Sequence, residues 1–238
     1  MSHRTWLRFS SAAAGVVLLF HGGISGAQIP LATGEYADVT DEGLHRVHPE
    51  LMEAAWVKPD LDLTRYSRVL LMPTAVQFRD VPGQTFNART RIEADAFPVE
   101  ESRKEWITRV WRDAVNERFG KETSYELFPG IADDVLVVQG FLVDVVSKIP
   151  PDDVGSSYAF VQDPWEASVV LELRDAMTGE MLARTMDRRL AQGLLDHASV
   201  WILTEDLIKR WAEVLHQRLE QLVDLQGPSG ANTPEFAR

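Results

Sequence analysis

Residues 66–226 carry two kinds of apolar pattern, and each predicts a different type of element. Apolar residues that alternate with polar ones, or that continue without interruption, predict strands at 68–72, 124–128, 134–149, 168–174 and 181–189. Apolar residues three and four positions apart predict amphipathic helices at 100–119 and 199–226. This part of the chain therefore mixes strands with two long helices.

Proline and glycine residues mark where these elements end. Pro73 closes the first strand, because proline has no N–H to give to a ladder. Residues 175–180 predict a hairpin connection in which Gly179 supplies a positive φ, and Pro129-Gly130 predicts a turn. The order of elements predicts an α+β fold: a mixed, mainly antiparallel sheet of about five strands with two long helices packed on one face.

The segments on either side of this region show little apolar periodicity. Residues 28–60 are rich in Asp, Glu, Gly and Pro, which predicts an extended arm without a regular element. Residues 227–238 are polar and contain proline, which predicts a disordered tail. The predicted organisation is an arm at 28–60, one α+β domain at 61–226 and a tail.

The first 27 residues have the layout of a secretory signal peptide. Arg4 and Arg8 precede an apolar core from Ala12 to Phe20, and small residues follow up to Ala27. The core is shorter than the roughly 20 residues that span a bilayer, which favours a cleaved signal over a retained anchor. The sequence predicts cleavage after Ala27 and a periplasmic or secreted protein with no membrane span after cleavage.

The charge balance limits the partners of the chain. The formal net charge is −12, and removal of Arg4 and Arg8 with the signal makes the mature chain more negative still. Such a charge repels phosphate backbones and anionic lipid, so nucleic-acid binding is not expected. The oligomeric state cannot be inferred from these features.

The absence of cysteine removes several chemistries. It excludes disulfides, thiolate metal sites and cysteine nucleophiles. The segment 24–27 is similar to the sequence at a lipid-bearing cysteine of exported lipoproteins, with Ala27 in place of that cysteine. It is either a former lipoprotein signal or an ordinary cleavage site, and both give an unanchored mature protein.

Few residues are spaced for catalysis or metal binding. His45 and His48 are the only close histidine pair, and Pro49 with the weak local periodicity argues against a rigid metal site. His197 follows Asp196, but no Gly-x-Ser-x-Gly elbow is present, so a polar pair at a helix start is the simpler interpretation. We predict no catalytic residue, no metal site and no cofactor, and a non-enzymatic function is favoured.

Two long connections are the best candidates for a functional surface. Residues 77–99 and 148–164 combine aromatic with polar residues, as interfaces do. The alternative is that the aromatic residues fold back and cover the sheet edge. The two connections meet only if the strands at 68–72 and 134–149 are parallel. The possible interaction surface comprises Phe86, Phe97, Tyr158, Phe160 and Trp165.

Three segments together resemble a known family. They are DLTRYSRVLLMP at 62–73, LRDAMTGEMLA at 173–183, and Asp187-Arg188-Arg189 before the last helix. The chain resembles, over about residues 55–225, a bacterial family of unknown function numbered thirty-three thirteen. The resemblance implies an exported, lipoprotein-like protein, although Ala27 departs from the lipid-bearing members. More loosely, the element order resembles small periplasmic α+β domains of envelope-assembly and secretion accessory proteins, an analogy that does not fix function.

Two functional hypotheses remain open. The first is an exported, non-enzymatic accessory module that binds another envelope protein through the two aromatic connections. The second is a binder or hydrolase of a small envelope-derived ligand in a pocket lined by those connections.

Overall fold

The computed structural model describes residues 29–81, 96–121, 125–150, 160–196 and 199–226. The predicted signal, its cleavage site at Ala27 and the predicted tail lie outside these residues, as do parts of both aromatic connections. Within the described ranges, no helix is both long enough and apolar enough to cross a bilayer.

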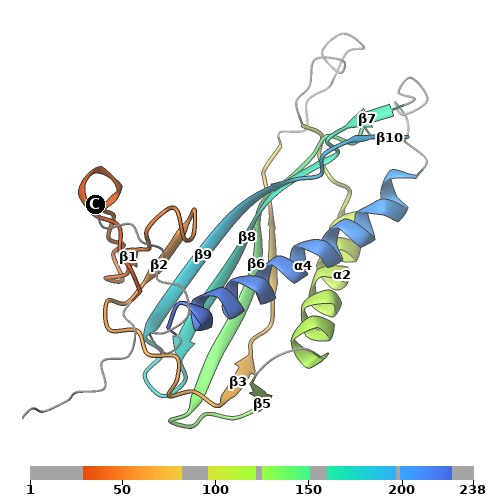
Figure 1. The fold of residues 1–238 in the computed structure, drawn as a ribbon. Coiled ribbons are helices and arrows are strands. Elements are labelled where there is room, and N and C mark those ends of the chain that lie inside the picture. Colours follow the sequence, from red (N-terminus) through yellow and green to blue (C-terminus); the bar gives the residue numbers. More distant parts are fainter. Residues whose placement is uncertain (1–28, 82–95, 122–124, 151–159, 197–198, 227–238) are drawn as a thin grey trace, which may run out of the picture.

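Two long helices and a large sheet form the protein (Figure 1). The helices are α2 (Glu101–Lys121) and α4 (Val200–Asp224), with a short 3-10 turn η1 (Gly34–Tyr36). The strands are β1 (His45–Arg46), β2 (Ala55–Val57), β3 (Arg68–Leu71), β4 (Ala75–Phe78), β5 (Glu126–Leu127), β6 (Val135–Ser147), β7 (Phe160–Gln162), β8 (Trp165–Asp175), β9 (Met181–Leu190) and β10 (Leu194–Asp196).

The main sheet is larger than the sequence predicts. Eight strands pair in the order β1-β2-β9-β8-β6-β3-β5, and β4 also pairs with β6. The prediction of about five strands is therefore wrong in number, whereas the mixed, mainly antiparallel α+β class is confirmed. The additional strands are two to four residues long, too short to show an apolar period. A second, two-stranded sheet joins β10 to β7.

A three-stranded antiparallel unit, β6–β8–β9, forms the centre of the main sheet. Leu171 lies between Gly140 of β6 and Thr185 of β9 in this register. The connection between β8 and β9 is the predicted hairpin, and Gly179 adopts φ +72°, a conformation that glycine reaches without strain. The long alternating runs of the sequence correspond to this unit.

Two strands share the remaining edge of β6. The first part of β6 pairs in parallel with β3, and the later part pairs in parallel with β4. Pro73 lies between β3 and β4, where it interrupts the ladder as expected. The strand β5 pairs in parallel with β3 rather than with β6, so the turn predicted at Pro129-Gly130 does not join β5 and β6 as a hairpin.

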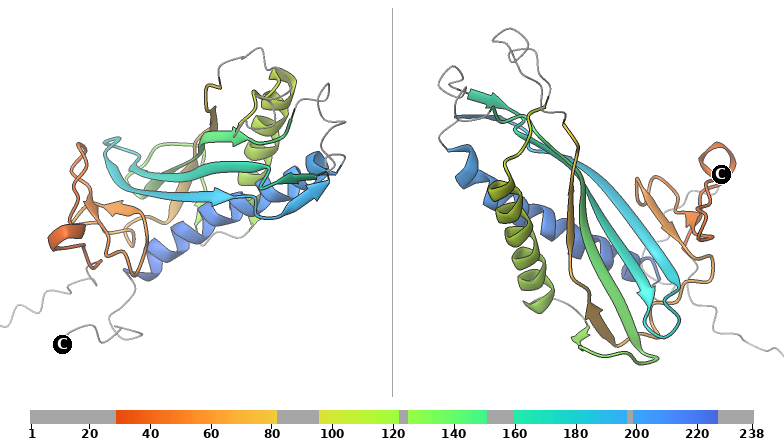
Figure 2. Two further views of the ribbon diagram at one scale, coloured as in Figure 1. Left: turned by 90° about the horizontal axis from the view of Figure 1, so that it is seen from above. Right: turned by 180° about the vertical axis from the view of Figure 1, so that it is seen from behind.

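Both helices cover the same face of the sheet, as predicted (Figure 2). The helix α4 packs along β8, and α2 packs beside β4 and against α4. Gly140 in β6 lies beneath both helices, because a Cβ there would collide with Leu215 of α4 and lie 3.7 Å from Trp111 of α2. A glycine at this position lets the two helices approach the sheet closely.

The N-terminal segment contains more structure than an extended arm. The strand β2 pairs with β9 through Ala55 and Val57, and β1 pairs with β2. Trp56 donates an indole hydrogen bond to Asp38 at 2.8 Å. The expectation that residues 28–60 form no regular element is wrong here, because two- and three-residue strands are stabilised by their partners and leave little pattern of their own.

The hairpin end of the sheet is held by polar side chains. Asp175 is buried and accepts hydrogen bonds from the N–H groups of Met177 and Thr178 at 2.9 and 2.8 Å, and from the Tyr66 hydroxyl at 2.9 Å. Burial alone raises the pKa of this carboxyl, but these hydrogen bonds outweigh burial and lower it. At the same end, Gln226 accepts from the Leu63 N–H at 2.7 Å.

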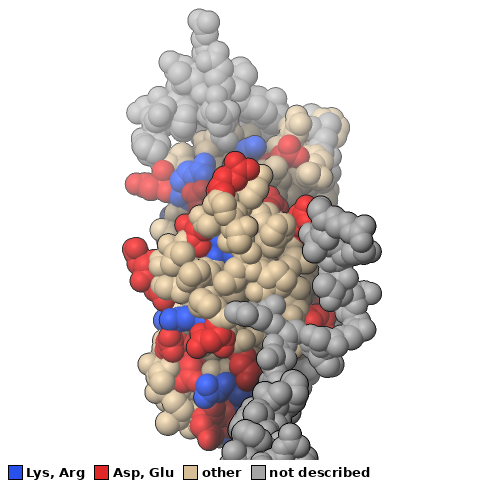
Figure 3. Space-filling model, turned by 60° about the vertical axis from the view of Figure 1, so that its left-hand side comes forward, with Lys and Arg blue, Asp and Glu red and all other residues tan. Residues whose placement is uncertain are grey.

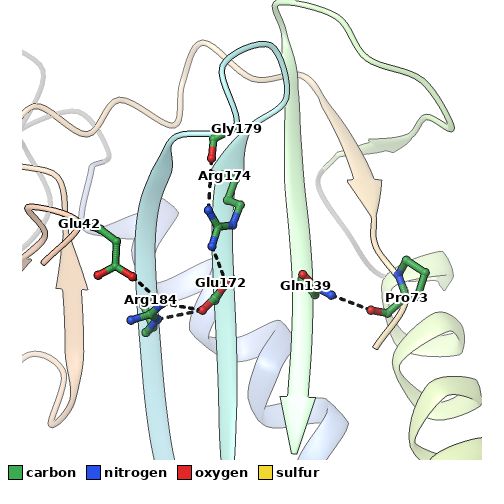
Figure 4. Close-up of polar contacts among 7 residues, drawn as sticks. All are labelled: Glu42, Pro73, Gln139, Glu172, Arg174, Gly179 and Arg184. Carbon is green, nitrogen blue, oxygen red and sulfur yellow. Dashed lines mark hydrogen bonds and ion pairs between the residues drawn. The ribbon is translucent and has the colours of Figure 1, made fainter. Parts of the chain in front are cut away.

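The sheet face opposite the helices is lined by paired charges (Figure 4). Arg184 donates to Glu172 at 2.9 Å and to Glu42 at 3.1 Å, and Gln139 donates to the Pro73 carbonyl at 2.9 Å. Seen from the left of Figure 1, uncharged side chains occupy the middle of the surface, and acidic and basic residues lie mainly around them (Figure 3).

Candidate functional site

One end of the main sheet, opposite the hairpin end, gathers the segments that the sequence proposes as functional. The carboxyl ends of β4 and β6 and the first turns of α2 and α4 lie there, together with the start of β8 (Figure 1). We call this the loop end. Because β3 and β4 are both parallel to β6, the described parts of the two aromatic connections reach the same end of the sheet. At their junction the Phe97 N–H donates to the Ser147 carbonyl at 2.7 Å.

A cluster of tryptophans stabilises the loop end from inside. The Trp201 ring meets Trp106 and Trp165 edge-on, with centroids 6.3 and 5.7 Å apart, and the Arg103 guanidinium lies 4.2 Å above it. Trp165 donates its indole N–H to the Thr204 hydroxyl at 2.8 Å. These contacts attach the start of α4 to β8 and make the base of the loop end rigid.

The five residues of the possible interaction surface have different environments. Phe97 and Trp165 are 4% and 2% exposed, so their side chains pack in the core as the fold-back alternative describes. Phe160 on β7 is 58% exposed and is accessible to a partner. Phe86 and Tyr158 lie outside the described residues. An interaction surface on these connections stays a prediction, and Phe97 and Trp165 would support it from beneath.

A groove of about 450 Å³ opens at the loop end between β9 and α4. One wall is the end of β9 with Leu190 and Ala191, and the other is the first half of α4 with Leu203 and Leu207. Trp165 lies at its base. We call this the β9–α4 groove. Its volume is in the range of about 300–1,000 Å³ that is common for ligand sites.

The charged residues that line the β9–α4 groove are both basic. They are Arg189 and Arg210, and no Asp or Glu contributes to the lining. Arg210 is exposed and has no ion-pair partner among the described residues. Arg189 donates to Asp187 at 3.1 Å, but Arg218 also donates to Asp187, with one of its bonds at 2.8 Å. One carboxylate therefore serves two guanidinium groups, those of Arg189 and Arg218.

A sharp bend separates the groove from the ribbon β7–β10. Asp163, between β7 and β8, adopts φ +46°, and Gly193, between β9 and β10, adopts φ +128°. The Asp163 N–H donates to the Gly193 carbonyl at 2.8 Å, and the Gly193 N–H donates to the Asp163 carboxylate at 2.9 Å. This reciprocal pair fixes the bend at which β8 and β9 give way to β7 and β10, and so shapes the upper rim of the groove.

The histidines that the sequence singles out do not come together. His45 lies on β1 and His48 lies 4.0 Å from Glu50, and neither histidine lines the β9–α4 groove. No cluster of three potential metal ligands occurs in the parts of the chain that the structure describes. His197 falls outside those parts.

The position of His216 beside the apolar stripe of the last helix predicts a surface residue, and this prediction is wrong. It is buried, and its ring meets Phe119 edge-on at 5.7 Å. Nearby, burial and the charge of Glu220 raise the pKa of Tyr125 to about 12. These residues fill the space between the ends of α2 and α4.

Of the groove residues, the sequence analysis proposes Trp165 as a candidate for the interaction surface, but neither of the two arginines. Arg189 and Arg210 belong to a predicted strand and a predicted helix, where arginine is ordinary. Arg210 lies outside the apolar stripe and outside any run of paired charges. Such a position is the one sign in the sequence that its charge is left unbalanced, and it is too weak to predict a site. Only the packing of α4 against β8 brings the two arginines to one groove.

No family model matches the chain, and no curated protein matches it. Among solved structures, it is similar to the PelC dodecamer from Paraburkholderia phytofirmans, with 14% identity, a TM-score of 0.31, and coverage of 68% of this chain and 88% of that one. It is also similar to a Xanthomonas campestris protein of a family of unknown function numbered 330, with 13% identity, a TM-score of 0.38, and coverage of 67% and 87%.

A third similar structure is a neuraminyllactose-binding hemagglutinin homologue from Helicobacter pylori, with 10% identity and a TM-score of 0.39. The match covers 68% of this chain and 89% of that chain. At these identities and TM-scores, the three matches assign neither a function nor a partner to the protein described here.

Proposed function

We propose that this chain is an exported, non-enzymatic protein of the cell envelope that acts by binding another envelope protein through its loop end. Export is supported by the layout of residues 1–27, with cleavage after Ala27. The resemblance to the exported family numbered thirty-three thirteen supports the same location.

The observation that carries the binding role is a group of exposed apolar side chains around the β9–α4 groove. Leu190 and Leu203 line the groove and are 45% and 39% exposed. Ile202 in the first turn of α4 and Phe160 on β7 are exposed at the same end. Apolar side chains gathered around a concave surface are typical of interaction sites.

The test is photocrosslinking in the cells that make the protein. A benzophenone amino acid replaces Leu203 or Leu190 in separate variants, and adducts are identified by mass spectrometry. We expect the same protein in both adducts. The purified mature chain is sequenced from its N-terminus in parallel, and we expect it to begin at Gln28.

Met177 provides a matched control for this experiment. It is as exposed as Phe160 but lies in the turn of the β8–β9 hairpin, at the opposite end of the sheet. Benzophenone at position 177 is expected to give no adduct with the same partner. Equal adducts at 177 and 203, or none at 190 and 203, contradict the proposal.

A second candidate function is binding or hydrolysis of a small envelope-derived ligand in the β9–α4 groove. The volume of about 450 Å³ and the two arginines favour it. A thermal-shift screen with envelope metabolites and glycans tests it, and a saturable rise in the unfolding temperature that Arg210→Gln abolishes supports it. A flat screen counts against it.

A further inference from the structure

Part of β9 has an unpaired edge. Its partner on the far side from β8 is β2, which pairs only with Ala183, Arg184 and Thr185. One more bond extends this contact, from the Met186 N–H to the Ala54 carbonyl at 2.9 Å. Beyond Met186, no described strand covers this edge of β9.

The direction of the backbone groups follows from the ladder. The Met186 N–H points away from β8, and the Ala191 N–H points toward it, since it donates to the Trp165 carbonyl at 2.8 Å. Because N–H and C=O groups alternate along a strand, those of Arg188 and Leu190 point away from β8. Among the described residues, none is hydrogen-bonded to the backbone of Arg188 or Leu190 on this side.

The unpaired edge borders the β9–α4 groove. Leu190 and Ala191 line the groove from β9, and Leu203 and Leu207 line it from α4. A strand edge facing an apolar helix is the arrangement in which an extended peptide adds to a sheet. Its backbone pairs with the edge, and every second side chain enters the apolar groove.

The charge of the groove selects among extended peptides. The chain carries a net charge of −12, yet the charged residues lining this groove are Arg189 and Arg210. A basic or neutral peptide gains nothing from these guanidinium groups. A peptide with carboxylates beside its apolar residues pairs with both.

We propose that the β9–α4 groove receives an extended acidic segment of the partner protein, which adds as a strand to β9 at Arg188 and Leu190 and places carboxylates near Arg189 and Arg210. This inference rests on the proposed function, because it names the chemistry of the partner at the same site. Unlike the proposed function, it predicts the backbone conformation and the charge of the bound segment.

The test uses two synthetic hexapeptides and the purified chain. Both peptides carry serine at every second position; the three positions between, which face the groove, are valine, glutamate and valine in one peptide and valine, lysine and valine in the other, with blocked ends and a fluorescent label. We expect the acidic peptide to bind at least about tenfold more tightly by fluorescence anisotropy. No binding of the acidic peptide up to about 1 mM, or equal binding of both peptides, overturns the inference.

Two pairs of variants distinguish the contribution of backbone hydrogen bonds from that of the groove charge to peptide binding. Leu190→Pro removes the N–H that faces the unpaired edge, and Leu190→Ala keeps that N–H while shortening the same side chain. We expect Leu190→Pro to weaken the acidic peptide about fivefold to tenfold relative to Leu190→Ala. Thermal unfolding of each variant verifies that the fold is retained.

Arg210→Gln and Lys209→Gln form the second pair. Both remove one positive charge from the same turn of α4, but Lys209 lies in the groove between α4 and α2, where it pairs with Glu205 at 2.8 Å. Only Arg210→Gln is expected to weaken the acidic peptide, about threefold or more. An equal effect of the two substitutions overturns the charge assignment.

The remaining outcomes distinguish the other occupants. Peptide binding that falls in Arg210→Gln but not in Leu190→Pro makes this a site for a small anion and overturns strand addition. A dimer in light scattering that Leu190→Pro dissociates makes a second copy of the chain the occupant and also overturns it. If the peptides fail while crosslinks at 190 and 203 persist, this inference falls and the proposed function stands.

Discussion

The hairpin end and the loop end of the sheet differ in how their polar groups are used. At the hairpin end, Asp175 is enclosed and accepts bonds from its own turn and from Tyr66. At the loop end, Arg210 faces a groove without an ion-pair partner in the described structure. Polar groups that are hydrogen-bonded within the protein stabilise its fold. A charge without an ion-pair partner beside apolar surface is instead available to bind another molecule. The comparison separates polar groups that stabilise the fold from polar groups left available to the proposed partner.

The largest loss of stability is expected in the middle of the sheet, where Gly140 packs beneath both helices. Gly140→Val places a branched side chain against Leu215 and Trp111, which forces the helices away from the sheet. We expect the free energy of unfolding to fall by about 3 kcal/mol, measured by urea denaturation. Gly120→Ala is the control, since a Cβ there meets no atom within 4 Å, and an equally large loss in this variant would contradict the explanation.

An intermediate effect is expected at the hairpin end. Asp175→Asn leaves the turn N–H groups with a weaker acceptor, and we expect a loss of about 2 kcal/mol at pH 7. The lowered pKa of Asp175 means that its contribution is complete above the ordinary value of 3.8 and is lost as the pH falls through the lower folded value. Stability of the variant should therefore decline less steeply than that of the unmodified chain below about pH 4.

The loop end supplies the control for this comparison. Asp144 also has a lowered pKa, because Arg79 donates hydrogen bonds to it, but both side chains are about half exposed. Solvent screens such a pair, so Asp144→Asn is expected to cost less than about 1 kcal/mol. Equal losses for the two asparagine variants would remove the distinction between the ends.

The smallest effect on stability is expected at the exposed start of α4. Ile202 is 74% exposed, so Ile202→Ser should change the free energy of unfolding by no more than about 0.5 kcal/mol. The same change should reduce the adduct at position 203, because it removes apolar surface from the proposed interface. Ile208→Ser, on the buried side of the same helix, should instead destabilise the protein strongly in thermal unfolding.

The parts of the fold that follow from sequence are those with a long, regular pattern. The β8–β9 hairpin, both helices and the position of Gly179 are predicted correctly because each rests on local periodicity or on a local turn. The short strands β1, β2 and β4 are missed, because pairing with distant residues stabilises them. The groove is missed for a related reason: Arg189 and Arg210 are brought together by packing, which no sequence spacing records.

The pairing of β2 with β9 also affects how the chain is completed. Ala55 and Val57 find their partners at Thr185 and Ala183, more than a hundred residues later. During synthesis, β2 therefore cannot pair until β9, the second strand of the hairpin, has been made. Contacts between residues so far apart in the sequence form slowly. Until then β1 and β2 have been made but have no partner in the main sheet, so the segment that is synthesised early is among the last to be fixed in place.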